Sequence, residues 1–268
     1  MKRWLGGGLL LLALLLGGAW AARAPLGVWL VGRIAADRAG RDLTAGLPDG
    51  LHVLLCGTGS PLPDPSRAES CTLVVAGRTL LLVDAGDGAA RNLGRWGVPL
   101  GRLQAVLVTH LHSDHVEGLP GIALQRWVGG AAQTPLPLLG PPGVEQLAAG
   151  FSMALTADNG WRTAHHGPAI APPAGAGMSG RAMAPGVVWN RDGVVVTAFL
   201  VNHTPVAPAY GYRVDYKGRS VVISGDTAAS PAVVAAAKGA DVLVHEALQP
   251  NLLTLLTDAL AAKGHAHT

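Results

Sequence analysis

The sequence is poor in cysteine and in charged residues. It contains 2 cysteines in 268 residues, and 14% of its residues are charged against 49% that are hydrophobic. Two cysteines cannot form the disulfide framework of a small secreted scaffold. A chain with so much apolar sequence is also unlike an intrinsically disordered protein. The length suits a single domain built around one core.

The two cysteines, Cys56 and Cys71, belong to no recognisable metal-binding or redox pattern. We expect both to be small, unpaired side chains buried on strands, because free cysteine is among the most buried residue types. The alternative is a single disulfide, which would require that the domain lie outside the cytoplasm.

The sequence also lacks a block of basic residues. Lys and Arg together number 20 against 17 Asp and Glu, and two of the basic residues, Lys2 and Arg3, lie at the very start of the chain. The remaining excess is small and shows no basic stripe. The charge pattern therefore disfavours a nucleic-acid partner.

An apolar run from residue 4 to residue 20 follows Lys2 and Arg3, and Ala19-Trp20-Ala21 has the small-x-small form of a signal-peptidase site. We interpret residues 1–34 as a signal peptide or an N-terminal membrane anchor. Both interpretations predict an exported domain, periplasmic or otherwise extracytoplasmic, with the option of membrane attachment. Residues 35–50 are polar and rich in turn formers, so they are predicted to be a linker.

Residues 51–268 carry short apolar runs separated by turn residues and by helical patterns. Strands are predicted at 51–56, 72–76, 79–83, 105–109, 137–140, 187–190, 194–201, 210–216, 219–224 and 241–245. Helices are predicted at 89–96, 118–128, 143–155, 231–238 and 252–263, and a long irregular loop at 167–186. This order indicates an α/β protein with helices outside a layered sheet.

The residues best suited to chemistry follow the predicted strand at 105–109. His110, His112, Asp114 and His115 fall within six positions. Side chains two apart in extended chain project to the same side, so His110 and His112 can bind one ion. Imidazole and carboxylate ligands suit zinc and similar divalent ions. The segment therefore predicts a metal centre.

This segment resembles the HxHxDH motif of the metallo-β-lactamase superfamily. Three later segments agree with it: Val-Asn-His-Thr-Pro at 201–205, Val-Ile-Ser-Gly-Asp-Thr at 222–227 and Val-His-Glu-Ala at 244–247. The set is similar to the branch that holds ribonuclease Z and the bacterial arylsulfatases of this fold. The resemblance implies a four-layer αββα sandwich over residues 51–268.

The resemblance also implies a site for two Zn²⁺ ions, with Mn²⁺ or Fe as alternatives. The implied ligands of the first ion are His110, His112 and His203. The second ion would take Asp114 and His115, and Asp226 would bridge the two ions because a carboxylate has two oxygens.

A metal-bound hydroxide would then attack the ester at a site that includes Asp114. His245 is the candidate proton donor to the leaving oxygen, with Glu246 orienting it. Asp84 would accept an N–H from a ligand histidine. His52, His165 and His166 have no motif support and are interpreted as structural.

One part of the resemblance fails, because members of the family carry a further histidine at the end of a late strand. No such strand follows Glu246, so we expect a C-terminally truncated domain that lacks its last strand and one ligand of the second ion. The alternative is that His265 or His267 replaces this ligand.

The expected substrate is a small-molecule sulfate or phosphate ester, as for the arylsulfatase-like members. Nucleic acid is disfavoured because only a short hairpin lies between Tyr212 and Ser224, where a basic arm would be sought. The alternatives are a ribonuclease Z-like phosphodiesterase or endoribonuclease, and a metal-binding remnant without turnover. A homodimer is compatible with the sequence.

Overall fold

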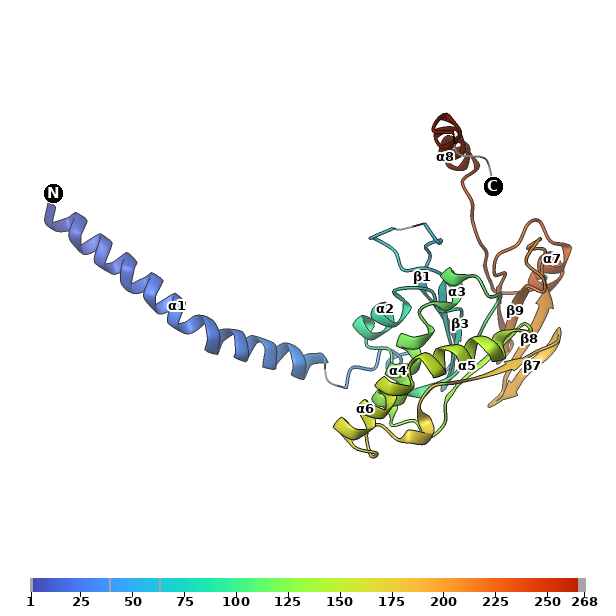
Figure 1. Ribbon diagram of the computed structural model, residues 1–268, viewed down its shortest axis with the longest axis horizontal. Coiled ribbons are helices and arrows are strands. Elements are labelled where there is room, and N and C mark those ends of the chain that lie inside the picture. Colours follow the sequence, from blue (N-terminus) through green and yellow to red (C-terminus); the bar gives the residue numbers. More distant parts are fainter. Residues whose placement is uncertain (1, 39, 63, 265–268) are drawn as a thin grey trace.

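The computed structural model describes residues 2–38, 40–62 and 64–264, with the side chains of 2–15, 37, 38, 252 and 256 excepted. Two mixed β-sheets form in this part of the chain, and helices pack outside them (Figure 1). The predicted α/β fold with two central sheets is confirmed.

Among the described residues, the first sheet contains six strands in the order β1 to β6. They are β1 (Leu51–Gly57), β2 (Cys71–Ala76), β3 (Thr79–Val83), β4 (Leu103–Leu107), β5 (Leu136–Gly140) and β6 (Met178–Ala182). The strands β1, β2 and β3 pair antiparallel, whereas β3, β4, β5 and β6 run parallel.

The second sheet, over the same described ranges, has the order β11-β10-β9-β8-β7. Its strands are β7 (Gly186–Arg191), β8 (Val194–Leu200), β9 (Tyr210–Tyr216), β10 (Arg219–Ile223) and β11 (Val242–Val244). Only β10 and β11 run parallel, and the other pairs are antiparallel.

The α-helices are α1 (Lys2–Arg38), α2 (Ala89–Trp96), α3 (Ser113–Val116), α4 (Leu119–Gly130), α5 (Val144–Ala154), α6 (Thr156–His166), α7 (Pro231–Ala237) and α8 (Pro250–Ala262). Short 3₁₀ turns occur at Leu100–Arg102 and Pro173–Gly175. The helices α2, α4 and α5 cover the outer face of the first sheet, and α7 packs on the second.

The central strands are continuous apolar runs because both of their faces are covered. Every residue of β2 and β3 is buried. Alternate side chains therefore enter two different cores. Leu73 and Leu80 pack under the helices, whereas Val74 and Leu81 pack between the sheets.

The strands that precede the candidate site all end at one edge of the sandwich. The strands β3 and β4 are parallel, and β8 and β10 share a direction because each is antiparallel to β9. Two hydrogen bonds join the sheets at this edge: Tyr210 N donates to Thr109 O (2.9 Å), and Tyr212 Oη donates to Val108 O (2.6 Å). The connecting loops of both sheets are thereby brought together.

Part of the predicted loop at 167–186 is instead strand β6, so that prediction was wrong. The sequence Met-Ser-Gly-Arg-Ala contains one large apolar residue and no β-branched or aromatic residue, so its strand signal is weak. It forms a strand because it pairs in parallel with β5 at five successive positions, from Leu136↔Met178 to Gly140↔Ala182. A long-range partner, and not local sequence, determines this element.

The segment predicted as a linker lies against the domain. Leu43 N donates to Gly97 O (2.9 Å), the side chain of Thr44 is buried, and Asp42 forms an ion pair with Arg102 (3.0 Å). In the part of the chain that the structure describes, no helix is both long and apolar enough to cross a membrane. The signal peptide, the anchor and the export of the domain stay predictions.

At the other end, α8 extends away from the sandwich after β11 (Figure 1). No strand follows β11 among residues 245–264. The two histidines considered as replacement ligands, His265 and His267, lie outside the described residues.

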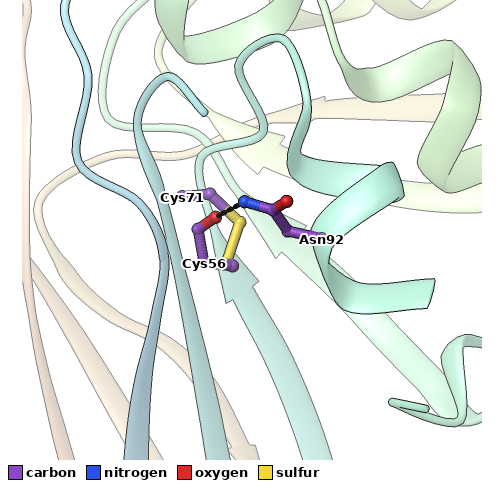
Figure 2. The surroundings of a disulfide bond; sticks show 3 residues. All are labelled: Cys56, Cys71 and Asn92. Atoms are coloured by element: carbon purple, nitrogen blue, oxygen red, sulfur yellow. Dashed lines mark hydrogen bonds between the residues drawn. A yellow bond between two sulfur atoms is a disulfide. The ribbon is translucent and has the colours of Figure 1, made fainter. Parts of the chain in front are cut away.

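The cysteines form a disulfide, so the prediction of two unpaired side chains was wrong. Cys56 and Cys71 lie on the paired strands β1 and β2, with their Cα atoms 5.0 Å apart (Figure 2). Both are buried, and Asn92 of α2 donates a side-chain hydrogen bond to Cys56 O (2.8 Å). The spacing alone could not reveal the pairing, because the return of the chain through residues 57–70 brings the two residues together.

The disulfide is predicted to stabilise the domain by closing a loop with a sequence separation of 15 residues. Replacing both cysteines, Cys56→Ala with Cys71→Ala, should lower the free energy of unfolding by about 3 kcal/mol. Urea denaturation of both proteins, with and without reductant, measures this. Reductant should destabilise only the wild type, and a wild type insensitive to reductant would contradict the prediction.

Candidate metal centre

The candidate ligands come from loops that follow strands of both sheets. His110 and His112 follow β4, and α3 carries Asp114 and His115. His203 follows β8 of the second sheet. The structure thus gathers residues that are up to 93 positions apart (203 − 110) at one edge.

The remaining candidate, Asp226, follows β10 through a tight turn. Gly225 in this turn has φ +61°, and a Cβ atom there would lie 2.9 Å from Tyr210 O and 3.0 Å from Thr109 Cβ. Glycine is therefore required both by the left-handed backbone and by the close approach of the other loops. The turn places Asp226 beside the histidines.

Three histidine rings, His110, His112 and His203, converge with ligand atoms within 4.8 Å of one another. His112 Nδ1 lies 3.0 Å from His110 Nε2 and 3.4 Å from His203 Nε2. One N–H can form a hydrogen bond between the nitrogens of two rings, but it leaves the nitrogen of the third ring without a partner. A divalent cation accepts all three lone pairs, so this three-histidine group fits the metal that the motif implies.

A second group joins His115 to Asp226, with His115 Nε2 3.3 Å from Asp226 Oδ1. His110 also lies within range of both. Asp114 Oδ2 is 3.6 Å from His115 Nε2, but Asp114 falls outside the two clusters of converging ligand atoms. A neutral imidazole nitrogen has one lone pair, so His110 can bind only one of two ions, whereas Asp226 can face both.

Burial and neighbouring charges shift the pKa values of two of these rings, His110 and His115, in opposite directions. Burial, followed by the charge of His115, lowers the pKa of His110 to about 3. Burial also opposes the charged form of His115, but Asp84 and Asp226 outweigh it and raise the pKa of His115 to about 10. With this raised pKa the His115 ring carries a proton near pH 7, and a cation that binds its Nε2 must displace that proton.

The two carboxylates of the site also differ. Burial raises the pKa of Asp114 above its usual value, with His115 opposing this and Asp226 adding to it. Burial acts in the same direction on Asp226, but its hydrogen bond with His115 and the charges of the nearby histidines hold its pKa below the usual value. Asp226 is thus the carboxylate better stabilised as an anion.

Asp84 lies beneath the candidate ligands, immediately after β3. Its Oδ2 atom is 2.8 Å from His115 Nδ1 and accepts a hydrogen bond from Thr109 Oγ1 (2.8 Å). Its Oδ1 atom accepts one from Thr109 N (2.8 Å). A carboxylate that accepts from His115 Nδ1 leaves Nε2 facing Asp226.

Thr109, which links Asp84 to the histidines, was not singled out from the sequence. Its only sequence signal is a polar residue at the end of a buried strand, immediately before His110.

The pair at the end of β11 differs from the prediction. Glu246 was expected to orient His245, but its carboxylate accepts a hydrogen bond from Thr227 N, next to Asp226. The ring of His245 is exposed, and its Nδ1 lies 2.8 Å from the backbone oxygen of Glu246. His245 belongs to neither ligand group. The reason is that the Glu246 carboxylate is already paired with the Thr227 backbone, so that His245 is left with only the carbonyl oxygen of Glu246.

Among the described residues, His52, His165 and His166 lie outside the two ligand groups. His52 Nε2 contacts Pro48 O (2.8 Å). His165 and His166 are exposed at the end of α6.

Comparison with known proteins agrees with this fold. The sequence profile of the metallo-beta-lactamase superfamily matches residues 65–265. A ribonuclease Z of Mycobacterium avium (strain 104) is 43% identical over 208 residues, which cover 77% of this chain and 73% of that protein. One of Mycobacterium marinum is 41% identical over 206 residues, covering 76% and 73%.

Solved structures give the same result. The short form of human tRNase Z superposes with a TM-score of 0.58 at 25% identity, over 81% of this chain and 83% of that one. A metallo-beta-lactamase fold protein of Bacillus subtilis has a TM-score of 0.55 at 22% identity, over 73% and 71%, which supports the fold alone.

This chain therefore belongs to the metallo-β-lactamase superfamily, and it is a metal-dependent hydrolase. The superfamily fold implies binding of a divalent metal, and the structure contains a His/Asp cluster that could hold one.

The relatives correct two expectations drawn from the sequence. An arylsulfatase-like enzyme with a small-molecule ester as partner was expected, and nucleic acid was disfavoured. Both expectations were wrong, because the curated relatives that match most of the chain are named ribonuclease Z. The net charge of the whole chain was a poor guide to the substrate, because it does not describe the electrostatic field at one edge of the fold.

The three-histidine group predicts that His112 and His203 contribute to the same ion. His112→Ala and His203→Ala should each lower the bound metal by about one ion per chain, because two remaining ligands hold zinc weakly. His165→Ala, an exposed histidine on α6, is the matched control and should bind as the wild type does. Elemental analysis after dialysis measures the content. Normal metal content in His203→Ala would remove that residue from the ligand set.

Metal binding at His115 should also release a proton. Because the pKa of His115 in the metal-free protein is about 10, the ring is protonated near pH 7 and a cation must displace the proton on Nε2. We expect release of about one proton at this position and a metal affinity that rises with pH. Calorimetry in two buffers of different ionisation enthalpy measures it, and identical heats in both would contradict it.

Proposed function

We propose that this chain is an endoribonuclease of the ribonuclease Z type that cleaves precursor tRNA with the help of zinc. The observation that carries the proposal is 43% identity over 208 residues to a ribonuclease Z, in a chain whose fold gathers four histidines and an aspartate that could hold metal at one edge. The likeness to human tRNase Z supports tRNA as the class of RNA.

The donor set favours zinc over magnesium or calcium. The three-histidine group offers only imidazole nitrogens, and magnesium and calcium prefer oxygen ligands. Mn²⁺ and Fe²⁺ accept mixed nitrogen and oxygen ligands and are the alternatives to compare. Bound divalent ions would polarise a phosphoryl oxygen and acidify a water molecule.

The protein's own groups would handle the protons of the reaction. Asp114 is buried beside His115 and has a raised pKa, which makes its carboxylate a better proton acceptor. His245 is the proposed donor to the leaving oxygen. The Glu246 carbonyl oxygen beside His245 Nδ1 can only accept a hydrogen bond, so Nδ1 carries a hydrogen. The nitrogen that would donate a proton to the leaving oxygen is therefore Nε2.

The proposal predicts turnover of RNA and not of small esters. Purified protein with Zn²⁺ or Mn²⁺ should cut a precursor tRNA that carries a 3′ extension, and should leave aryl sulfates intact. His112→Ala should reduce the rate of RNA cleavage by about 100-fold or more. Mutating a residue that only hydrogen-bonds to a metal ligand already costs 10–100-fold in activity, and removing a ligand should cost at least as much. His165→Ala should cleave as the wild type does.

The assay has two contradicting outcomes. Turnover of aryl sulfates with no cleavage of precursor tRNA would overturn the proposed substrate. Full metal loading with no turnover of any substrate would favour a metal-binding remnant.

A further inference from the structure

The side chain of Thr109 lies beneath the ligand histidines and is fully buried. Its hydroxyl Oγ1 is 2.8 Å from Asp84 Oδ2, 3.1 Å from His110 Nδ1 and 3.4 Å from His115 Nδ1. One hydroxyl therefore stands between a buried carboxylate and two of the proposed metal ligands.

The backbone of Thr109 is fixed on both sides. Its N–H donates to Asp84 Oδ1 (2.8 Å), and its carbonyl oxygen accepts from Tyr210 N of the second sheet (2.9 Å). The preceding carbonyl, Val108 O, accepts from Tyr212 Oη (2.6 Å). A threonine side chain has few χ1 rotamers, and the hydrogen bond from Oγ1 to Asp84 Oδ2 selects one of them.

The hydrogen-bond partners determine which way the hydroxyl proton points. Oxygen atoms of an ionised carboxylate only accept, so Asp84 Oδ2 at 2.8 Å receives the proton of Thr109 Oγ1. Because the hydroxyl donates its only hydrogen to Asp84, its oxygen can only accept a hydrogen bond from His110 Nδ1. That nitrogen must carry a hydrogen, and the lone pair of His110 must lie on Nε2.

His110 Nε2 is the atom that faces the other histidines, 3.0 Å from His112 Nδ1. Asp84 has the same effect on His115, whose Nδ1 lies 2.8 Å away and whose Nε2 faces Asp226. The carboxylate acts directly on one ring and through Thr109 on the other. One buried anion can thus orient a ligand in each of the two groups.

We propose that Thr109 is a positioning residue that fixes the Nδ1–H tautomer of His110 and so presents Nε2 to the first metal ion. This inference rests on the metal ligands of the proposed function and not on its RNA substrate. The methyl group of Thr109 packs against the Gly225 turn, but the hydroxyl carries the effect.

Two variants separate the hydroxyl from the shape of the side chain. Thr109→Val keeps the shape and removes the hydroxyl, so His110 Nδ1–H loses its acceptor. Thr109→Ser keeps the hydroxyl and loses the methyl group. The matched control is Thr79→Val, a buried threonine at the opposite end of β3 from Asp84.

The readout is the zinc affinity of each protein, measured by competition with a chromophoric chelator. Thr109→Val should bind the tighter zinc ion 10–100-fold more weakly than the wild type, as expected when a partner of a ligand histidine is lost. Thr109→Ser should recover most of the affinity, and Thr79→Val should match the wild type. A folded Thr109→Val with wild-type affinity would overturn the proposal.

A measurement on the unmutated protein is independent of how the variants fold. Nitrogen-15 NMR of the zinc-loaded wild type distinguishes the metal-bound from the protonated ring nitrogen. We expect His110 to carry hydrogen on Nδ1 and zinc on Nε2. Zinc on Nδ1 of His110 would sink the idea. Neither readout uses RNA, so a failure to cleave precursor tRNA would overturn the proposed function alone.

Discussion

The arrangement of the site depends on the buried carboxylate of Asp84. It receives hydrogen bonds from Thr109 N, Thr109 Oγ1 and His115 Nδ1, which lie on the chain that leaves β4 and on α3. A buried anion without such donors would be strongly destabilising, so the folded chain must keep them in place. The requirement to satisfy one charge therefore fixes two ligand-bearing segments.

The second constraint is the joining of two sheets at one edge. His110 and His115 come from the first sheet, and His203 and Asp226 come from the second, so no single sheet contains a complete ligand group. The hydrogen bonds from Tyr210 and Tyr212 to the end of β4 hold the edges together. Packing of apolar strand faces between the sheets supports the same arrangement. The metal site is thus a product of tertiary structure.

The sequence could indicate the candidate ligands because their pattern is local: HxHxDH follows an apolar strand, and Asp226 follows another. Among the partners of those residues it indicated Asp84, but it did not indicate Thr109, and it assigned Glu246 a different partner. Thr109 and Glu246 act through hydrogen bonds to other segments, and β6 forms only because β5 lies beside it. The disulfide was not predicted for the same reason, because Cys56 and Cys71 meet only when β1 and β2 pair. Charge counting also failed for the substrate, since net charge describes solubility better than the surface of one site.

We expect the His/Asp cluster to hold divalent ions in a working hydrolase. Anomalous diffraction from zinc-soaked crystals, collected above and below the zinc edge, tests it most directly. We expect a strong zinc peak bounded by His110, His112 and His203, and a second beside His115 and Asp226. Zinc bound elsewhere, with no peak at the three histidines, would contradict the account.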